Sequence, residues 1–276
     1  MTSIPFTKAH GAKNDFLLTW EDEAPPAGRE AIARAICHRY TGIGADGWML
    51  VPRRASGDAD AAIQLYNSDG SIPEISGNGT RCAAALLIHH GLAGETVRIG
   101  TGAGIKTLRL LGRSGLEFEF EMDMGRPTVL DAAFELSVAG GPREVALLNV
   151  GNPQCVVPVP NFDFDWRAMG AEIERHPHFP NRTNVSFIRA LDEHTVEARF
   201  WERGAGETMS SGTGSTGAAA AAVARGMAQS PVTVKTPAGP IGLRLTDSAY
   251  LTGPAVLTAE GQYFVCENVL GCLKQP

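Results

Sequence analysis

Ser76-Gly77-Asn78-Gly79-Thr80 and Ser211-Gly212-Thr213-Gly214-Ser215 are two copies of one turn, and each copy leads into an alanine-rich apolar run. The copies lie 135 residues apart (211 − 76 = 135), about half of the 276-residue chain. The same offset aligns Leu108-Arg109-Leu110 with Leu243-Arg244-Leu245. Self-similarity at a fixed spacing indicates an internal repeat. The sequence therefore predicts a duplicated domain with one such turn in each half.

The apolar pattern predicts the fold of each half. The runs at about 80–90 and 215–226 are apolar around most of their circumference, which is typical of a helix surrounded by protein. Further helices are predicted at 28–39 and 166–175. Short β-rich runs separated by turn residues predict strands at 15–20, 48–52, 63–67, 97–100, 106–111, 116–122, 145–150, 155–159, 183–188, 196–201, 232–236 and 241–245.

These elements predict an α+β fold of two pseudo-symmetric domains, each a mixed, mostly antiparallel sheet wrapped around a central apolar helix. The boundary is expected near Gly112 to Leu116. Residues 1–115 with about 264–276 would form the N-terminal half-domain, and residues 116–263 the C-terminal half-domain. The active site is expected in the cleft between them.

Composition restricts the class of partner. The chain is 43% hydrophobic and 20% charged, with a net charge of −6, so it lacks the basic excess that nucleic-acid or anionic-membrane binding needs. A small substrate is therefore expected, with no nucleic acid and no membrane. The first residues show no signal pattern, and no apolar run approaches the roughly 18 residues of a membrane span. A cytoplasmic location follows as an expectation.

Metals and nucleotide cofactors are not indicated. The five cysteines, at 37, 82, 155, 266 and 272, include no C-x-x-C pair, so neither a zinc site nor a disulfide framework is predicted. His89 and His90 end a predicted helix, where the helix dipole explains them. The G-x-G-x-x-G pattern occurs twice, at 42–47 and 212–217, but neither copy lies in a βαβ unit with a suitably spaced acidic residue.

Ser76 and Ser211 have a structural and a functional interpretation. Serine is a preferred N-cap residue, and glycines commonly follow where a chain turns tightly into a helix. Taken singly, each serine is better explained as a cap than as a catalyst. As a pair, two helix N-termini that face each other would offer free N–H groups and two positive dipole ends to one carboxylate. The repeat therefore favours a small-anion site.

A second group of polar residues lies at the predicted strand ends. Each could be a turn residue that satisfies its own backbone. Together their side chains supply donors and acceptors for an ammonium and a carboxylate, which indicates an amino-acid pocket. The group comprises Asn14, Asn67, Asn152, Asn184, Glu202 and Arg203.

At these residues the chain resembles the diaminopimelate epimerases, which are cofactor-independent amino-acid epimerases and racemases. Matching segments occur in order along nearly the whole chain, which makes the resemblance specific. They are His10-Gly11-Ala12-Lys13-Asn14-Asp15-Phe16, Thr41-Gly42-Ile43-Gly44-Ala45-Asp46-Gly47, Tyr66-Asn67-Ser68-Asp69-Gly70-Ser71, Ser76-Gly77-Asn78-Gly79-Thr80-Arg81-Cys82, Gly151-Asn152-Pro153, Phe179-Pro180-Asn181-Arg182-Thr183-Asn184-Val185 and Trp201-Glu202-Arg203-Gly204-Ala205-Gly206-Glu207-Thr208.

The resemblance implies a homodimeric isomerase without pyridoxal phosphate or metal. In the family, a cysteine at each helix-entry turn takes or returns the α-proton on one face of the substrate; here these positions are Ser76 and Ser211. The family also carries a histidine where this chain has Gln154. By the same resemblance, Gly77-Asn78 and Gly212-Thr213 would hold the α-carboxylate through backbone N–H groups. The distal end of the substrate would contact Asn67, Asn152, Asn184, Glu202 and Arg203.

We therefore expect diaminopimelate-epimerase-type inversion at an amino-acid α-carbon, impaired or altered by the two serines. A thiol is much more acidic than an alcohol, and a serine nucleophile or base usually depends on an adjacent general base. Two alternatives stay open at the level of sequence. One is a related racemase, isomerase or dehydratase with another amino-acid substrate. The other is a catalytically silent amino-acid binder, including a chain whose cysteines were replaced to stop turnover.

Overall fold

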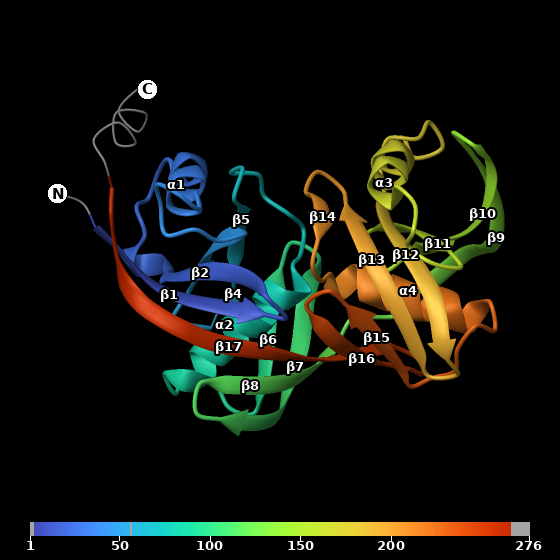
Figure 1. The fold of residues 1–276 in the computed structure, drawn as a ribbon. Helices are drawn as coiled ribbons and strands as arrows, with labels where there is room; N and C mark the ends of the chain where they lie inside the picture. The colour runs from blue at the N-terminus through green and yellow to red at the C-terminus, as the bar shows by residue number, and fades with distance from the viewer. Residues whose placement is uncertain (1–2, 56, 266–276) are drawn as a thin grey trace. The chain divides into compact units, whose positions relative to one another are not determined.

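The computed structural model describes residues 3–55 and 57–265, and the chain forms two compact units (Figure 1). Unit 1 comprises residues up to Met122 together with those from Pro254, and unit 2 comprises Asp123–Gly253. These limits differ from the predicted ones at 115/116 and 263/264. The last segment predicted for the first half, about 264–276, falls almost entirely outside the described residues.

The two limits differ from the prediction because of how β8 and β17 pair. Strand β8 (Glu117–Asp123) pairs antiparallel with β7 (Gly104–Ser114), so it belongs to the first unit. Strand β17 (Ala249–Phe264) pairs with β1 (Ser3–Gly11) from Val256 onward, which extends the C-terminal contribution to unit 1 by about ten residues.

Unit 1 is a mixed sheet with helices on it. Its strands are β1, β2 (Asn14–Trp20), β3 (Gly47–Val51), β4 (Ala61–Ala62), β5 (Gln64–Asn67), β6 (Thr96–Thr101), β7, β8 and the second part of β17. Strands β2 and β3 are parallel, as are β4 and β6; the pairs β1–β2, β3–β5, β6–β7 and β7–β8 are antiparallel. Helix α2 (Gly77–His89) packs on β1, β2 and β6.

Unit 2 has the same organisation. Its strands are β9 (Thr128–Val138), β10 (Gly141–Asn149), β11 (Pro153–Pro158), β12 (Asn184–Asp192), β13 (Thr195–Glu202), β14 (Gly206–Thr208), β15 (Val232–Thr236), β16 (Gly239–Leu245) and the start of β17. Helix α4 (Gly212–Ala224) contacts β9 to β13, β15 and β16, so the sheet surrounds it (Figure 1).

Strand pairing shows the duplication directly. In unit 1 the parallel pair β2–β3 is followed by antiparallel β3–β5, parallel β4–β6 and antiparallel β6–β7. In unit 2 the parallel pair β11–β12 is followed by antiparallel β12–β13, parallel β13–β15 and antiparallel β15–β16. The predicted α+β fold of two pseudo-symmetric domains, each with a mixed sheet around a central apolar helix, is confirmed.

The central helices are buried because small residues cover most of their surface. Residues 77–87 of α2 and 212–222 of α4 are all buried. Glycine and alanine allow the surrounding strands to approach from every side, so neither helix presents a polar face to water. Both helices begin three residues before the predicted starts at 80 and 215, because the Gly-x-Gly segment forms the first helical turn rather than a loop.

A second helix in each unit packs on other parts of the sheet. Helix α1 (Arg29–Ile36) buries Ile32 and Ile36 in a cluster with Trp48. Helix α3 (Trp166–Glu174) buries Trp166 and Ile173 in a cluster with Phe187. These helices agree with the predictions at 28–39 and 166–175. Strands β1, β4, β9, β14 and most of β17 were not predicted. The first seven residues of β9 are largely exposed, so that segment lacks the apolar alternation of a half-buried strand.

Candidate functional site

Ser76 is the N-cap of α2 in unit 1. Its backbone is extended (φ −125°, ψ 113°), and its Oγ accepts a hydrogen bond of 3.1 Å from the Gly79 N–H. The Ser76 carbonyl accepts from both the N–H and the hydroxyl of Thr80. The N–H groups of Gly77 and Asn78 belong to the first helical turn, which has no intrahelical acceptor for them. This helix start can therefore bind an anion beside the Ser76 hydroxyl.

The Asn78 side chain is held in a line of hydrogen bonds. Its Nδ2 donates to Oδ1 of Asn14 at 3.2 Å, and Nδ2 of Asn14 donates to Asp46 at 2.6 Å. At the other end, Nη2 of Arg81 donates to Oδ1 of Asn78. Guanidinium groups only donate and carboxylates only accept, so the ends of the line fix the orientation of both amides. The structure thus brings together the predicted residues Ser76, Asn78 and Asn14.

A compact ionic group anchors the end of this line near Asn14. Arg39 pairs with Asp15 and Asp46, each at 2.8 Å, and Lys8 pairs with Asp15 at 3.1 Å. Burial acts to raise the pKa of Asp15, but the hydrogen bonds and charges of Arg39 and Lys8 outweigh it and lower that pKa below its usual value. Two carboxylates and two cations therefore balance each other around Asn14.

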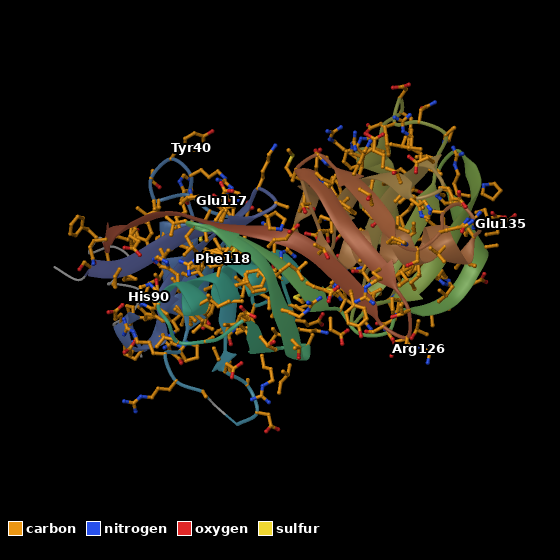
Figure 2. The ribbon with its side chains drawn as sticks, turned by 90° about the horizontal axis from the view of Figure 1, so that it is seen from below. Tyr40, His90, Glu117, Phe118, Arg126 and Glu135 are labelled. Atoms are coloured by element: carbon orange, nitrogen blue, oxygen red, sulfur yellow. The ribbon has the colours of Figure 1, made fainter. Side chains whose placement is uncertain are left out.

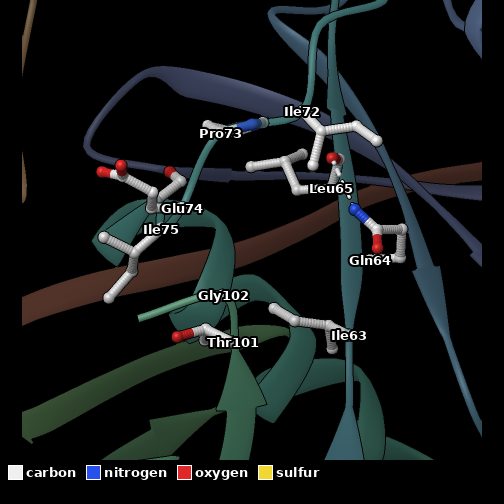
Figure 3. A pocket seen from close by; sticks show the side chains of 10 residues that line it. Ile63, Gln64, Leu65, Ile72, Pro73, Glu74, Ile75, Thr101 and Gly102 are labelled. Carbon is white, nitrogen blue, oxygen red and sulfur yellow. Dashed lines mark hydrogen bonds between the residues drawn. The ribbon is translucent and has the colours of Figure 1, made fainter. Parts of the chain in front are cut away.

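A small pocket lies beside Ser76 in unit 1 (Figure 3). Its volume of about 90 Å³ is well below the range of roughly 300–1,000 Å³ that is usual for small-molecule sites, so it can hold only part of a ligand. Its wall is mainly apolar, and Figure 3 shows Gln64 turned back onto the Leu65 carbonyl. The lining residues are Ile63, Gln64, Leu65, Ile72, Pro73, Glu74, Ile75, Ser76, Thr101 and Gly102.

Ser211 is the N-cap of α4 in unit 2 and repeats the geometry of Ser76. Its backbone is extended (φ −137°, ψ 125°), and its Oγ accepts from the Gly214 N–H at 3.0 Å. Its carbonyl accepts from the Ser215 N–H at 2.9 Å. Gly212 and Thr213 supply the first-turn N–H groups here. A Cβ on Gly214 would come within 2.9 Å of Ser211 Oγ, so glycine is required at that position.

Asn152 and Gln154 lie beside the start of α4 in unit 2. We call the polar residues around each helix start, at Ser76 in unit 1 and at Ser211 in unit 2, a half-site. Nδ2 of Asn152 donates to the Thr213 hydroxyl at 3.3 Å, and Nε2 of Gln154 donates to Oδ1 of Asn152 at 2.7 Å. Gln154 is 1% exposed, and its Oε1 has no hydrogen-bond partner in the described part of the chain. The absence of a side chain on Gly217 makes room for Gln154, since a Cβ there would lie 3.2 Å from Gln154 Cγ.

The loop after β13 carries the predicted distal-end residues. Glu202 ends β13, and Arg203 follows it. The Arg203 N–H donates to Oδ1 of Asn184 at 2.9 Å, and Nη1 of Arg203 donates to the Asn181 carbonyl at 3.2 Å. Asn184 also donates to the Pro153 carbonyl at 3.2 Å, which links this loop to the Gly-Asn-Pro segment.

Glu174 also anchors the loop after β13. Its carboxylate accepts hydrogen bonds from Trp201 Nε1 and the Gly204 N–H, both at 3.0 Å, and pairs with Arg182 at 3.3 Å. Burial raises the pKa of Glu174, but these hydrogen bonds and the positive charges outweigh it and hold the pKa below its usual value of 4.5. Glu174 is thus an ionised anchor next to Arg203.

Asn67 has a more local environment than the prediction supposed. Its Nδ2 donates to Ser71 Oγ at 2.9 Å, and its backbone N–H donates to the Ser71 carbonyl at 2.8 Å. Ser71 in turn donates to Asp69. No hydrogen bond in the described residues joins Asn67 to another predicted site residue of unit 1. Its role in substrate binding therefore stays a prediction.

One cluster of potential metal ligands lies in unit 1, away from Ser76. Within the residues described, His89, His90 and Glu260 place ligand atoms within 4.8 Å of one another, and all three are exposed (His90 is labelled in Figure 2). Nδ1 of His89 lies 3.2 Å from the Arg113 guanidinium, whose charge opposes a bound cation. The group lies at the opposite end of the 13-residue helix α2 from Ser76, about 20 Å along its axis.

The described cysteines are not acid/base groups at neutral pH. Burial raises the pKa of Cys37 and of Cys82 to about 12, and it raises the pKa of Cys155 as well. All three thiols are buried and unpaired.

In the described segments, every helix is too short or too polar to span a bilayer.

Two polar residues of these half-sites were not predicted as site residues. Arg81 lies within a helix that is otherwise apolar, and an arginine in such a run is a signal that sequence reasoning could have used. In the sequence, Gln154 is distinguished only by its departure from the family pattern. Its burial and its bond to Asn152 depend on how β11 packs against α4.

Comparison with known proteins supports the family resemblance seen in the sequence. The diaminopimelate epimerase family model matches residues 6–130 and 146–258. The diaminopimelate epimerase of Pelotomaculum thermopropionicum is 36% identical, with 94% of this chain and 98% of the relative covered. That of Moorella thermoacetica is 38% identical with the same coverage. A hydroxyproline epimerase structure from Agrobacterium vitis superposes with a TM-score of 0.74 at 16% identity, covering 99% of this chain and 98% of that chain.

Fold and relatives together define an isomerase of the racemase and epimerase class that acts on amino acids. The PhzF-family phenazine biosynthesis protein of Bacillus anthracis shares the fold, with a TM-score of 0.73 at 17% identity. The superposition covers 96% of this chain and 100% of the B. anthracis chain. The family match over most of the chain is decisive. This protein belongs to the diaminopimelate epimerase family.

Proposed function

We propose that the protein catalyses cofactor-independent inversion at the α-carbon of an amino acid, with diaminopimelate as the first substrate to test. L,L-diaminopimelate would be converted to the meso form, a step of lysine and cell-wall biosynthesis. One observation carries the proposal: a chain of this family has the same serine-capped helix start in each unit, at Ser76 and at Ser211.

The reaction needs two proton-transfer groups. One serine oxygen removes the α-proton, and the electron pair of the broken C–H bond is delocalised into the substrate carboxylate. The hydroxyl of the other serine then donates a proton to the opposite face of the α-carbon. Ser76 and Ser211 exchange roles in the reverse direction. No redox change occurs, and the substrate and product differ only in configuration.

The helix starts support charge development in this reaction. The N–H groups of Gly77 and Asn78 and those of Gly212 and Thr213 would bind the α-carboxylate, with the positive ends of both helix dipoles behind them. The hydrogen bonds from Gly79 and Gly214 to the serine oxygens favour the ionised form of each hydroxyl.

The distal end of the substrate is assigned to five polar residues. Arg203 can meet a second carboxylate in bidentate fashion. Asn184 and Glu174 support this assignment, because they hold the Arg203–Gly204 backbone in place. The proposed distal-end residues are Asn67, Asn152, Asn184, Glu202 and Arg203, and Asn14 is proposed to orient Asn78.

A second function, amino-acid binding without turnover, is favoured by the environment of the two hydroxyls. In the described residues each serine oxygen is hydrogen-bonded to its own helix, and no histidine, lysine or carboxylate is bonded to either. A helix N-terminus contributes up to about 2 kcal/mol, roughly 1.5 pK units, which is too little to bring an alcohol to the acidity of a thiol. Turnover is therefore expected to be slow, or directed to another amino acid.

A homodimer in the cytoplasm completes the proposal. The dimer is inferred from the family resemblance. Light scattering at micromolar concentration tests the oligomeric state, with a mass of 29.2 kDa for the monomer.

The deciding experiment is proton exchange in heavy water. The protein is incubated separately with L,L-diaminopimelate, with meso-diaminopimelate and with other amino acids, and α-deuterium is followed by mass spectrometry and inversion by chiral chromatography. Deuterium incorporation with inversion supports the epimerase. Binding without incorporation supports the silent binder. Incorporation only with another amino acid assigns a different substrate.

A further inference from the structure

Arg81 is buried without an anion to neutralise it. Its side chain is 0% exposed, and its donors go to three neutral oxygens: the Pro254 carbonyl at 3.1 Å, the Gly77 carbonyl at 3.3 Å and Oδ1 of Asn78. No carboxylate pairs with it among the described residues. Burying an unpaired charge is costly, so an arginine that remains buried calls for a compensating negative charge.

The surrounding charges do not supply that compensation. At the far end of the hydrogen-bond line from Arg81, the carboxylates of Asp15 and Asp46 are balanced by Arg39 and Lys8. Cys82, the next residue after Arg81, has its pKa raised by burial to about 12, so its thiol is neutral at pH 7. Of the three cations Lys8, Arg39 and Arg81, only Arg81 therefore has no carboxylate partner among the described residues. Burial lowers the pKa of Arg81 only to about 10, so the guanidinium keeps its charge at neutral pH.

Unit 2 has the same geometry without this charge. The 135-residue offset places Thr216 where unit 1 has Arg81 (81 + 135 = 216). The Thr216 hydroxyl donates to the Gly212 carbonyl at 2.9 Å, as Nη1 of Arg81 donates to that of Gly77. The amide that approaches the start of α4, from Asn152, is held by the neutral Gln154. The two helix starts thus share their serine cap, and the buried cation Arg81 of α2 is replaced by the neutral Thr216 in α4.

We propose that Arg81 is a positioning residue that makes the start of α2 the stronger anion site, so that Ser76 is the more acidic of the two serine hydroxyls. The guanidinium acts in two ways. It fixes the Asn78 side chain beside the first-turn N–H groups, and it adds a full positive charge to the partial charge of the helix dipole. This inference rests on the proposed function for its catalytic meaning, because it assigns unequal roles to the two proton-transfer groups.

The test measures acidity directly, without turnover. Ser76→Cys and Ser211→Cys are made separately in a chain that also carries Cys266→Ser and Cys272→Ser, and the thiol pKa is taken from the pH dependence of alkylation. The thiol at position 76 should have the lower pKa, by about one unit or more, since an opposite charge nearby lowers such a pKa by 1–3 units. Equal values, or a lower value at 211, would overturn the inference.

Variants at Arg81 separate charge from hydrogen bonding. In the Ser76→Cys background, Arg81→Gln should raise the thiol pKa by about one unit, and Arg81→Lys should raise it less because the charge stays. Thr216→Val in the Ser211→Cys background is the matched control and should leave that thiol within a few tenths of a unit. An unchanged pKa in a folded Arg81→Gln variant would contradict the proposal. If that variant does not fold, the comparison of the thiol pKa values at positions 76 and 211 still tests the proposal.

The two hypotheses fail in different experiments. Absence of deuterium exchange with every amino acid would remove the proposed epimerase while the thiols still differed in pKa. Equal thiol pKa values would remove the role of Arg81 while exchange still occurred.

Discussion

Nε2 of Gln154 donates a hydrogen bond of 2.7 Å to Oδ1 of Asn152, while Oε1 of the same glutamine has no hydrogen-bond partner among the described residues. The bond turns the Asn152 amide so that its Nδ2 meets the Thr213 hydroxyl. A buried residue that leaves one polar atom unsatisfied to hold another in place trades stability for geometry. Gln154 therefore supports the start of α4 although it was not predicted as a site residue.

Gln154→Leu should separate stability from binding. The variant loses one hydrogen bond but also removes a buried unsatisfied oxygen, so the free energy of unfolding should change by no more than about 1 kcal/mol. Asn152 loses its fixed orientation, and the affinity for diaminopimelate should fall by roughly three- to tenfold, a cost of about 1 kcal/mol. Urea unfolding and isothermal titration calorimetry measure the two effects.

Ser186→Ala is the control for this prediction. Ser186 is also buried in unit 2 with an unsatisfied side-chain oxygen, but it is not hydrogen-bonded to Asn152. It should leave the affinity unchanged. If both variants weaken binding equally, the effect comes from general loosening of unit 2 and not from Asn152.

Arg203→Lys should discriminate between ligands. The planar guanidinium can meet both oxygens of a second carboxylate, and lysine cannot copy that geometry. Binding of diaminopimelate should weaken by about tenfold, in the range of a lost charge-assisted hydrogen bond, while binding of a monocarboxylic amino acid should change little. Equal losses for both ligands in calorimetric titrations would argue against a distal-carboxylate role for Arg203.

Glu174→Gln should destabilise the protein in a pH-dependent way. The two carboxylate oxygens accept from Trp201 Nε1 and the Gly204 N–H, whereas a glutamine amide has one accepting oxygen and an NH₂ group that only donates, so one of the two hydrogen bonds is lost. At pH 7 the free energy of unfolding should fall by about 2–3 kcal/mol. The pKa of Glu174 is lowered in the folded state, so its contribution is present above the unfolded value near 4.5 and is lost as the pH falls through the folded pKa.

The difference in the free energy of unfolding between the parent protein and Glu174→Gln should therefore become smaller when urea unfolding is repeated below pH 4.5. Glu135→Gln makes the same chemical change on an exposed glutamate of β9 (labelled in Figure 2) and should have little effect at any pH. A gap for Glu174→Gln that stays constant from pH 7 to pH 3.5 would show that the native carboxylate gains nothing from its charge.

The fold was predictable because its decisive features are periodic. Small residues cover most of the surface of α2 and α4, and the 135-residue repeat shows that the two helices are equivalent. The start of each helix was placed three residues late, because a Gly-x-Gly turn and a first helical turn have the same composition. Strand β9 was missed because its first seven residues face solvent or are only partly covered, which removes the alternation that marks a strand.

The half-sites were predictable in part, for a different reason. The serines and the first-turn residues are adjacent in sequence, so their arrangement is local. The line from Arg81 through Asn78 and Asn14 to Asp46 joins three separate segments of the chain. Such contacts follow from tertiary packing, and no spacing in one sequence reveals them. The sequence shows an arginine in an apolar run, but that Arg81 is bonded only to neutral oxygens follows from the tertiary structure.

Ser76→Cys combined with Ser211→Cys should increase epimerisation of diaminopimelate by about a hundredfold or more, because a thiol is far easier to ionise than an alcohol and effective acid–base groups contribute factors of this size. Each single variant should gain less, since inversion needs a base on one face and an acid on the other. Deuterium incorporation and inversion are measured separately, because one thiol can permit exchange on a single face without completing inversion. If the double variant stays inert with diaminopimelate while the parent chain turns over a different amino acid, the serines serve another reaction and the epimerase proposal is wrong.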